Sequence, residues 1–189
     1  IKRFIQTSTS EVYGTPKEIP ITEKNILNAQ SPYAASKIAA DQIALSFHKS
    51  FDCPVVIIRP FNTFGPRQSL RAIIPTIISQ VQNHNQKVIK LGNIHTKRDF
   101  NFVDDIIDGF VLALNKKNII GEVINLGTGY EYTIKDIVKI VEKILNKKIK
   151  IKIDKTRIRP KASEVQRLIA SNKKAKNLLD WQPKYSKGK

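Results

Sequence analysis

Short runs of β-branched residues alternate with longer stretches of helical periodicity along this chain, and this alternation limits its possible folds more than any other feature. The runs have the length and composition of strands, and they lie at residues 3–6, 55–58, 88–90, 122–126 and 150–153. Apolar residues recur at helical spacing in residues 73–81, 103–114 and 134–145. Because strands and helices follow one another in this way, we expect a mostly parallel sheet with right-handed crossovers. The sequence therefore predicts an α/β fold.

Capping residues indicate where two of the helices begin. Ser31 followed by Pro32 places a cap and a first-turn proline before a helix that runs to about Ser50. Thr133, with an aspartate three residues later, has the spacing of a capping box. Beyond Trp181 the chain is polar, and the sequence predicts a frayed tail there.

The composition is that of a globular protein from a reducing compartment. With 189 residues, 41% of them hydrophobic, the chain is long enough to bury a core. Its single cysteine, Cys53, has no internal disulfide partner, and no Cys/His cluster has metal-ligand spacing. No apolar run approaches the roughly 20 residues of a membrane span, and no signal-peptide pattern opens the chain. We therefore expect a soluble, cytoplasmic protein without a metal or a membrane partner.

The formal net charge of +17 raises the question of an anionic partner such as nucleic acid. The excess is mostly lysine, and it is spread over several separate segments alongside many isoleucines and asparagines. Aromatic residues are not interleaved with the lysines as they are in a groove that binds single strands. The pattern favours a solvated lysine surface, and nucleic-acid binding stays a less favoured alternative.

Polar residues follow the first predicted strand directly. Ligands of an open parallel sheet bind beyond the carboxyl ends of its strands, and residues 7–11 are four hydroxyl-bearing side chains and a glutamate. Such a segment is either a turn that bonds its own backbone or part of a site. Tyr33 and Lys37 lie four residues apart, on one face of the predicted helix. A nearby ammonium favours the phenolate, so this pair is suited to take a proton from a sugar hydroxyl, although surface residues of any helix show the same spacing.

Six ordered motifs carry a resemblance that extends from Phe4 to Pro183. They are TSEVYG at 9–14, SPYAASK at 31–37, RPFN with GPR at 59–67, RDF at 98–100, NLG at 125–127 and RPKASEV at 159–165. In this order they resemble the NAD-dependent epimerase/dehydratase family, which comprises extended short-chain dehydrogenase/reductases that act on nucleotide sugars. The resemblance is strongest to bacterial nucleotide-sugar 4,6-dehydratases of the legionaminic-acid type and of the GDP-mannose type.

The resemblance implies roles for the first two motifs. Tyr33 would be the base toward the sugar C4 hydroxyl, Lys37 its electrostatic partner, and Thr9 would orient the same hydroxyl. Glu11 would remove the C5 proton, and Ser10 stands where many dTDP-glucose dehydratases have an aspartate that acts as acid. Glu11 itself, or water held by Ser10, would then deliver that proton.

The remaining motifs imply cofactor and substrate contacts. NAD, with NADP not excluded, would meet residues of the strand ends and of the helix: Ser8, Tyr33, Lys37 and Pro60. The diphosphate of a nucleotide-diphosphate sugar needs cationic and amide donors, which the resemblance assigns to Asn62, Arg67, Arg98, Asn125 and Arg159. Asp99 and Asp104 would brace Arg98 and cap the following helix.

Three functions stay open. A 4,6-dehydratase is favoured because simple 4-epimerases carry a small residue at the position of Glu11. A UDP-glucuronate decarboxylase or a 4-epimerase of the same family is the alternative, since decarboxylases share the Thr-Ser-Glu segment. A further alternative is an inactive fragment or a basic nucleic-acid-binding protein.

The glycine-rich turn that binds the NAD pyrophosphate in this family is missing from the sequence. We therefore expect a piece of a longer protein: the C-terminal portion of a Rossmann-type parallel sheet with a smaller α/β substrate-binding domain. Residues 1–66 are expected to form the second half of the NAD-binding domain. Residues 67–189 would be mainly substrate-binding, with 102–127 returning to the Rossmann layer. The family also implies a homodimer through the helix at 31–50.

Overall fold

A three-stranded parallel sheet forms the larger lobe of the protein. The computed structural model describes residues 1–82 and 88–186. The sheet has the order β1 (Phe4–Thr7), β2 (Val55–Pro60), β7 (Val123–Leu126), with all its strands parallel. The middle strand β2 is buried from Val55 to Arg59, as expected for a strand that is covered on both faces.

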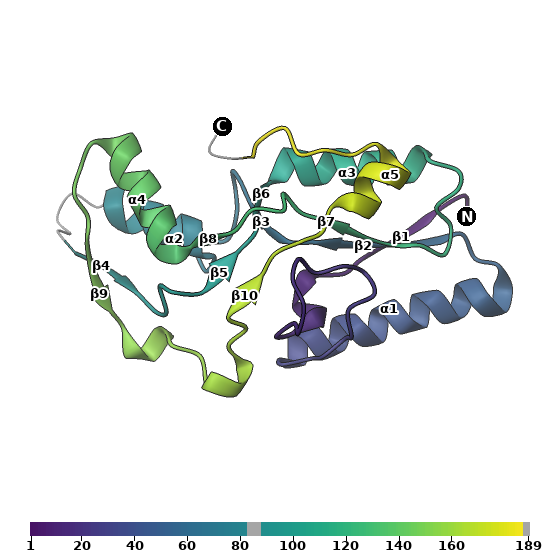
Figure 1. Ribbon diagram of the computed structural model, residues 1–189, viewed down its shortest axis with the longest axis horizontal. Helices are drawn as coiled ribbons and strands as arrows, with labels where there is room; N and C mark the ends of the chain where they lie inside the picture. The colour runs from purple at the N-terminus through teal and green to yellow at the C-terminus, as the bar shows by residue number, and fades with distance from the viewer. Residues whose placement is uncertain (83–87, 187–189) are drawn as a thin grey trace.

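Helices cover both faces of this sheet (Figure 1). The long helix α1 (Pro32–Phe51) packs on one face, where Ala44 contacts the cluster of Val55 and Ile57. On the other face lie α3 (Val103–Asn115) and α5 (Lys173–Leu179), which share a core with Val56, Ile58, Ile124 and Leu126. Strand residues thus alternate between the two helical layers, and the result is a three-layer α/β/α arrangement.

A smaller lobe has its own core. Its parallel pair is β4 (Val88–Leu91) with β9 (Lys150–Ile153), and its helices are α2 (Ile73–Gln82) and α4 (Ile134–Leu145). The apolar stripes of both helices meet alternate residues of β4, whose burial pattern is that of a half-buried strand. Figure 1 shows this lobe beside the end of the main sheet, away from the N-terminus.

Short elements that the sequence did not predict connect the two lobes. Strand β3 (Asn62–Phe64) pairs with β6 (Phe100–Phe102), and β5 (Lys97–Arg98) lies between β10 (Arg167–Leu168) and β8 (Tyr132–Thr133). Single turns of 3-10 helix are η1 (Ser10–Tyr13), η2 (Lys155–Arg157) and η3 (Lys161–Ser163). These elements hold several residues of the site described below, among them Glu11, Asn62 and Arg98.

The predicted caps are confirmed. The Ser31 hydroxyl accepts a hydrogen bond from the Ala34 amide at 3.1 Å, and Pro32 occupies the first turn of α1. Thr133 and Asp136 form a complete capping box at α4, with the Asp136 amide donating to the threonine hydroxyl at 3.0 Å.

The tail is ordered further than predicted. Trp181 is buried, and its indole N–H donates to the carbonyl of Asp105 at 2.7 Å. The Asp105 carboxylate then accepts from the amides of Lys184 and Tyr185, at 2.9 and 3.0 Å. The prediction of fraying directly after Trp181 was therefore wrong, because a buried aspartate on α3 binds the backbone of the tail.

No helix among residues 1–82 and 88–186 is long and apolar enough to cross a membrane. The same residues contain no group of histidine, cysteine and carboxylate side chains that would hold a metal ion.

Candidate active site

Glu11 is held at the carboxyl end of β1 by a tight turn. Thr9 is the N-cap of η1, and its hydroxyl accepts from the Glu11 amide at 3.3 Å. The turn closes at Gly14, whose φ of 56° lies in the left-handed region. A Cβ at Gly14 would lie 2.2 Å from the Asn28 carbonyl oxygen, so glycine is required there. The hydroxyl-rich segment is thus a structured turn that presents a carboxylate.

Tyr33 and Lys37 lie together on the first turns of α1. The Lys37 ammonium donates to the carbonyl of Thr7, the last residue of β1, at 3.0 Å. Its nitrogen lies 5.9 Å from the centroid of the Tyr33 ring, and Tyr33 is 53% exposed. Because α1 also packs against η1, the helix that carries this pair is joined to the turn that carries Glu11.

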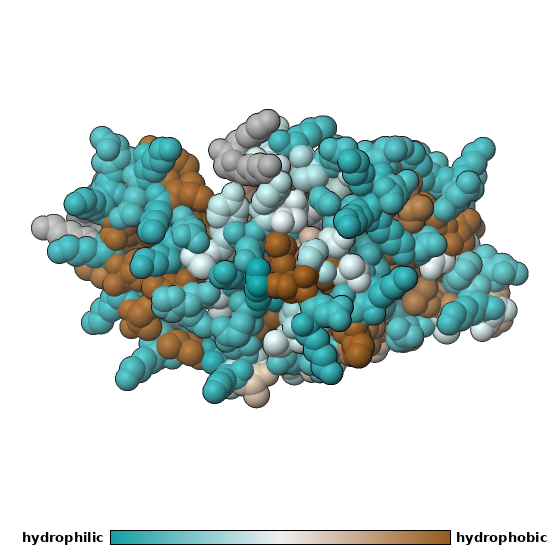
Figure 2. Space-filling view, viewed as in Figure 1, coloured by the Kyte–Doolittle hydropathy of each residue, from teal (hydrophilic) through white to brown (hydrophobic). Residues whose placement is uncertain are grey.

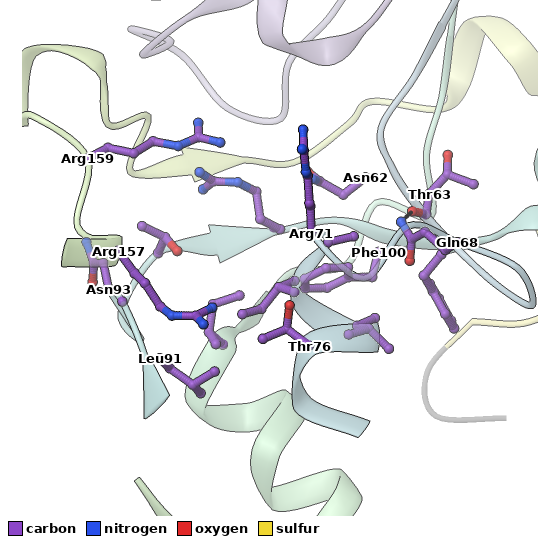
Figure 3. Close-up of a pocket in the computed structure, with 18 of the residues that line it drawn as sticks. Asn62, Thr63, Gln68, Arg71, Thr76, Leu91, Asn93, Phe100, Arg157 and Arg159 are labelled. Atoms are coloured by element: carbon purple, nitrogen blue, oxygen red, sulfur yellow. Dashed lines mark hydrogen bonds between the residues drawn. The ribbon is translucent and has the colours of Figure 1, made fainter. Parts of the chain in front are cut away.

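A cavity of about 340 Å³ lies between the lobes, and Glu11 is one of its walls. Figure 3 shows Asn62 from β3, Arg157 from η2, Arg159 from the loop before η3, and Gln68 and Arg71 from the loop before α2 around this cavity. Arg98 of β5 and Glu164, directly after η3, also line it. Tyr33 and Lys37 are not among its lining residues. The cavity therefore unites residues that are up to about 150 positions apart in sequence.

The charged side chains of the cavity are four arginines and two glutamates, so its formal charge is positive. Arg98 is buried and pairs with Glu164 at 3.7 Å. Burial lowers the pKa of the Arg98 guanidinium; the carboxylates of Glu11 and Glu164 oppose this, and Arg159 adds to it. Glu11, Glu164 and Arg159 thus all lie within electrostatic reach of Arg98. An arginine-rich cavity of this kind is suited to a ligand with several negative oxygens.

Two amide oxygens at the cavity have no partner among the described residues. They are Oδ1 of Asn62 and Oε1 of Gln68, and both are buried. The Gln68 amide nitrogen is already engaged, because it donates to the Thr63 carbonyl at 2.7 Å. Since buried polar atoms are normally hydrogen-bonded, these oxygens are suited to accept from hydroxyl or N–H groups of a ligand.

The structure divides the expected site residues into groups. Glu11, Asn62, Arg98 and Arg159 line one cavity. Thr9 and Ser10 are buried beside it, and Pro60 is the last residue of β2, half-buried. Arg67 is exposed, has a left-handed φ of 64° and does not line the cavity.

Ser8 and Asn125 occupy the interior, where a direct contact with cofactor or substrate was expected. The Ser8 hydroxyl donates to Asp41 at 2.7 Å, so its hydrogen is used within the protein. Asn125 is fully buried and bonds the Tyr13 hydroxyl and the Ile21 carbonyl. In this structure the Asn125 side chain has no surface to offer a ligand.

Asp99 does not brace Arg98, contrary to the expectation. Its carboxylate accepts from the amides of Thr128, Gly129 and Ala170 at 2.9, 2.9 and 3.1 Å, and from the Thr128 hydroxyl. Burial raises the pKa of this carboxyl, against the effect of those donors. Asp99 thus shapes the loop after β7. Helix α3 also lacks a side-chain cap, so the capping role expected of Asp104 is not observed.

Several cavity residues were missed by the sequence analysis. Arg157 lies two positions from Arg159, and Glu164 lies inside a motif that was noted without a role for the glutamate. Arg71 and Gln68 follow the GPR motif within a few residues. Their proximity to motifs was the available signal, but only the fold shows that these segments meet.

The visible surface (Figure 2) is hydrophilic over much of its area and is interrupted by apolar patches. Figure 2 shows hydrophilic side chains spread over both lobes of the visible face, without one continuous groove of that kind.

Comparison with known proteins identifies the family. The family model described as GDP-mannose 4,6 dehydratase matches residues 1–188. The dTDP-D-glucose 4,6-dehydratase of Dictyostelium discoideum is 38% identical over 157 residues, which are 77% of this chain and 35% of that protein. The chain belongs to the NAD-dependent epimerase/dehydratase family. The resemblance stated from the motifs is thereby confirmed.

Other members of the family are similar to the chain at comparable levels. UDP-glucuronic acid 4-epimerase from Bacillus cereus, solved with UDP-glucuronic acid and NAD, has a TM-score of 0.89 and 36% identity, covering 97% of this chain and 57% of that one. UDP-glucuronic acid decarboxylase 1 of Arabidopsis thaliana is 31% identical, covering 97% of this chain and 42% of that protein. The chain therefore spans between about a third and three fifths of the length of these relatives.

Proposed function

We propose that the whole protein carrying this chain is an NAD-dependent nucleotide-sugar 4,6-dehydratase. The observation that carries the proposal is Glu11, a carboxylate at the wall of a cavity that also holds four arginines. A base is needed at the sugar C5 for elimination, and cations are needed for the diphosphate. Glu11 and the arginines meet both needs in one cavity.

Tyr33 and Lys37 would begin the reaction. Tyr33, as a phenolate, would take the proton of the sugar C4 hydroxyl, and the Lys37 ammonium, 5.9 Å from the centroid of its ring, would be the counter-charge. Thr9, the cap of η1, lies beside Glu11 and would orient the same hydroxyl. NAD would supply a hydride acceptor at C4 and the hydride returned to C6.

Glu11 would then carry out the elimination. The ketone at C4 acidifies the C5 hydrogen, and Glu11 takes this proton while the C6–oxygen bond breaks. The proton returns with the departing hydroxyl, from Glu11 directly or through water held by Ser10, so that water leaves. A solvent proton at C5 and a hydride at C6 complete the 4-keto-6-deoxy product, and the atoms balance as loss of one water.

The chain contains residues that fit the nicotinamide end of the cofactor. Tyr33 is exposed at the start of α1, and Lys37 reaches the carboxyl end of β1, which is where cofactors of parallel sheets bind. We propose that Tyr33, Lys37 and the backbone at Pro60 hold that end. The sequence offers no glycine-rich turn for the pyrophosphate, which we assign to a part of the protein outside this chain.

An assay of product identity tests the proposal. The whole protein, incubated with NAD and UDP- or GDP-linked N-acetylglucosamine, is expected to yield a 4-keto-6-deoxy sugar nucleotide, detected by mass spectrometry as loss of water. Release of CO2 from UDP-glucuronate, with no loss of water from the first substrates, would overturn it.

A second candidate function is a 4-epimerase or decarboxylase of UDP-glucuronate. Its support is the 36% identity and TM-score of 0.89 to the Bacillus cereus epimerase. Epimerisation needs no base at C5 in addition to the C4 chemistry, so Glu11 would have no proton to remove. The same assay, with the products of UDP-glucuronate separated by chromatography, distinguishes these activities.

The proposal includes a homodimer in the cytoplasm. Its support is the family resemblance, which implies a dimer through helix α1 (Pro32–Phe51). Sedimentation of the whole protein at micromolar concentration is expected to show twice the mass of one chain. The single free cysteine, Cys53, is in keeping with a reducing compartment.

A further inference from the structure

A chain of buried polar groups lies beneath the proposed site. Oδ2 of Asp41 accepts from the Ser8 hydroxyl at 2.7 Å and from Nε and Nη2 of Arg59 at 3.2 and 3.0 Å. Nη1 of Arg59 donates to the Tyr13 hydroxyl at 2.9 Å, and this hydroxyl donates to Oδ1 of Asn125 at 2.8 Å. We call these five residues the Asp41 network.

The Asp41 network joins the pair Tyr33 and Lys37 to Glu11, the residues to which the reaction is assigned. Asp41 lies on α1, one turn beyond Lys37 and two beyond Tyr33. Tyr13 is the last residue of η1, the turn that contains Ser10 and Glu11. Arg59 of β2 bonds to Asp41 and to Tyr13. A single guanidinium thus fixes α1, which carries Tyr33 and Lys37, to η1, which carries Glu11.

Burial makes this link rigid. Asp41 is 0% exposed, Arg59 3% and Tyr13 1%, so water does not compete for their hydrogen bonds. Burial raises the pKa of the Tyr13 hydroxyl, which Arg59 opposes, and a protonated hydroxyl is the form that donates to Asn125. A buried ion pair adds little net stability compared with an apolar pair of the same volume. This ion pair therefore serves to fix the position of α1 relative to β2 and η1, not to add stability.

We propose that Tyr13, Arg59 and Asp41 are positioning residues, which hold Glu11 at the correct distance from Tyr33 across the sugar. This inference rests on the proposed function and assigns no contact with substrate to these residues. The mechanism requires two proton transfers, at neighbouring sugar carbons, by side chains on different elements. A displacement of about 1 Å can cost on the order of 100-fold in rate, so the distance between those elements has to be fixed.

The substitution Tyr13→Phe in the whole protein tests this proposal. It removes only the hydroxyl through which η1 is bonded to Arg59 and Asn125. We expect kcat for loss of water to fall about 10-fold to 100-fold, with KM for the nucleotide sugar within twofold. Hydrogen exchange of the backbone amides of residues 10–14 should accelerate, whichever sugar reaction the protein catalyses. Ser8→Ala, which removes one bond to Asp41 and keeps the ion pair, is expected to give a smaller change of the same kind.

Trp181→Phe is the control, because it removes the buried hydrogen bond of another aromatic side chain, on the far side of the sheet. It should lower stability without changing kcat per folded molecule. Equal kcat and equal exchange in Tyr13→Phe and the unsubstituted protein would overturn the inference, as would a loss of kcat no larger than that of Trp181→Phe. An unsubstituted protein that releases no water contradicts the proposed function instead; the exchange of residues 10–14 then still decides whether the Tyr13 hydroxyl fixes this turn.

Discussion

At the scale of single residues, Glu11 separates the proposed dehydration from other reactions of the family. Replacing Glu11 with Gln keeps the size of the side chain and its place at the cavity wall but removes the base. We expect loss of water to slow at least about 100-fold. Removal of the C4 hydrogen, which we assign to Tyr33, should persist. Transfer of deuterium from a C4-labelled sugar, followed by mass spectrometry, measures that step separately.

Glu131→Gln is the control for the Glu11 variant. Glu131 pairs with Lys97 and Arg167 and does not line the cavity. A glutamine at this position should therefore leave the rates of C4-hydrogen removal and of water loss unchanged. An unaltered rate of water loss in Glu11→Gln would remove Glu11 from its role.

Arg159 offers a test of the diphosphate contact without damage to the core. It is exposed and lines the cavity, whereas Arg98 is buried and paired with Glu164. Hydrogen bonds between charged partners contribute about 1.5–3 kcal/mol, so Arg159→Ala should raise KM for the nucleotide sugar roughly 10-fold to 100-fold with little change in kcat. Steady-state kinetics of Arg159→Ala and Arg167→Ala, whose guanidinium pairs with Glu131 outside the cavity, provide the comparison. Equal KM values would contradict the assignment.

At the scale of elements, the capping box of α4 gives a prediction for stability. Thr133→Ala removes the hydroxyl that accepts from the Asp136 amide, which should cost the helix about 1 kcal/mol. Hydrogen bonds from the Thr133 hydroxyl and amide lower the pKa of Asp136. The contribution of this carboxylate is therefore present above the pKa of an unfolded aspartate, about 4, and is lost as pH falls below it.

Hydrogen exchange of the α4 amides in the whole protein measures both effects. In the unsubstituted protein, protection of α4 should weaken as pH falls below about 4, after correction for the intrinsic exchange rate. Asp136→Asn should flatten this dependence. Protection that is the same in Thr133→Ala and the unsubstituted protein would show that packing alone fixes the start of α4.

The elements differ in how far the sequence determined them. The four long helices and five strands were predicted within about two residues, because each has a periodic apolar face or a cap such as Ser31. The two-residue and three-residue strands were not predicted, since their pairing depends on segments far apart in the chain, as with Phe100 beside Asn62. The same limit applied to the site. Motifs identified Glu11 and Arg98, but Arg71 and Arg157 joined them only through the packing of loops.

At the scale of the whole molecule, the sheet has an open edge flanked by apolar surfaces. Strand β1 pairs only with β2 among the described residues. A cavity of about 430 Å³ between β1 and α1 is lined largely by apolar side chains, including Phe4, Ile43 and Phe47. Helix α3 on the other face exposes Ile107, Val111 and Leu114 at helical spacing. Exposed edges and apolar faces are costly in water, so we propose that further strands and helices of the whole protein continue the three layers here.

The hydrogen bonds of β1 make that proposal testable at two amides. The amide of Phe4 donates to the carbonyl of Pro54, directly before β2, at 3.0 Å, and the amide of Ser8 donates to Ile58 of β2 at 2.8 Å. Because successive residues of a strand face opposite neighbours, the amides of Ile5 and Thr7 face the open edge. A further parallel strand would bond them, so their hydrogen exchange should be fast in this chain and slow in the whole protein. The amide of Ser8 should be protected in both, which controls for unfolding of β1. Fast exchange of Ile5 and Thr7 in the whole protein would mean that the sheet ends at β1, and the cofactor would then have to be held without the parallel strands that bring its pyrophosphate to a helix N-terminus.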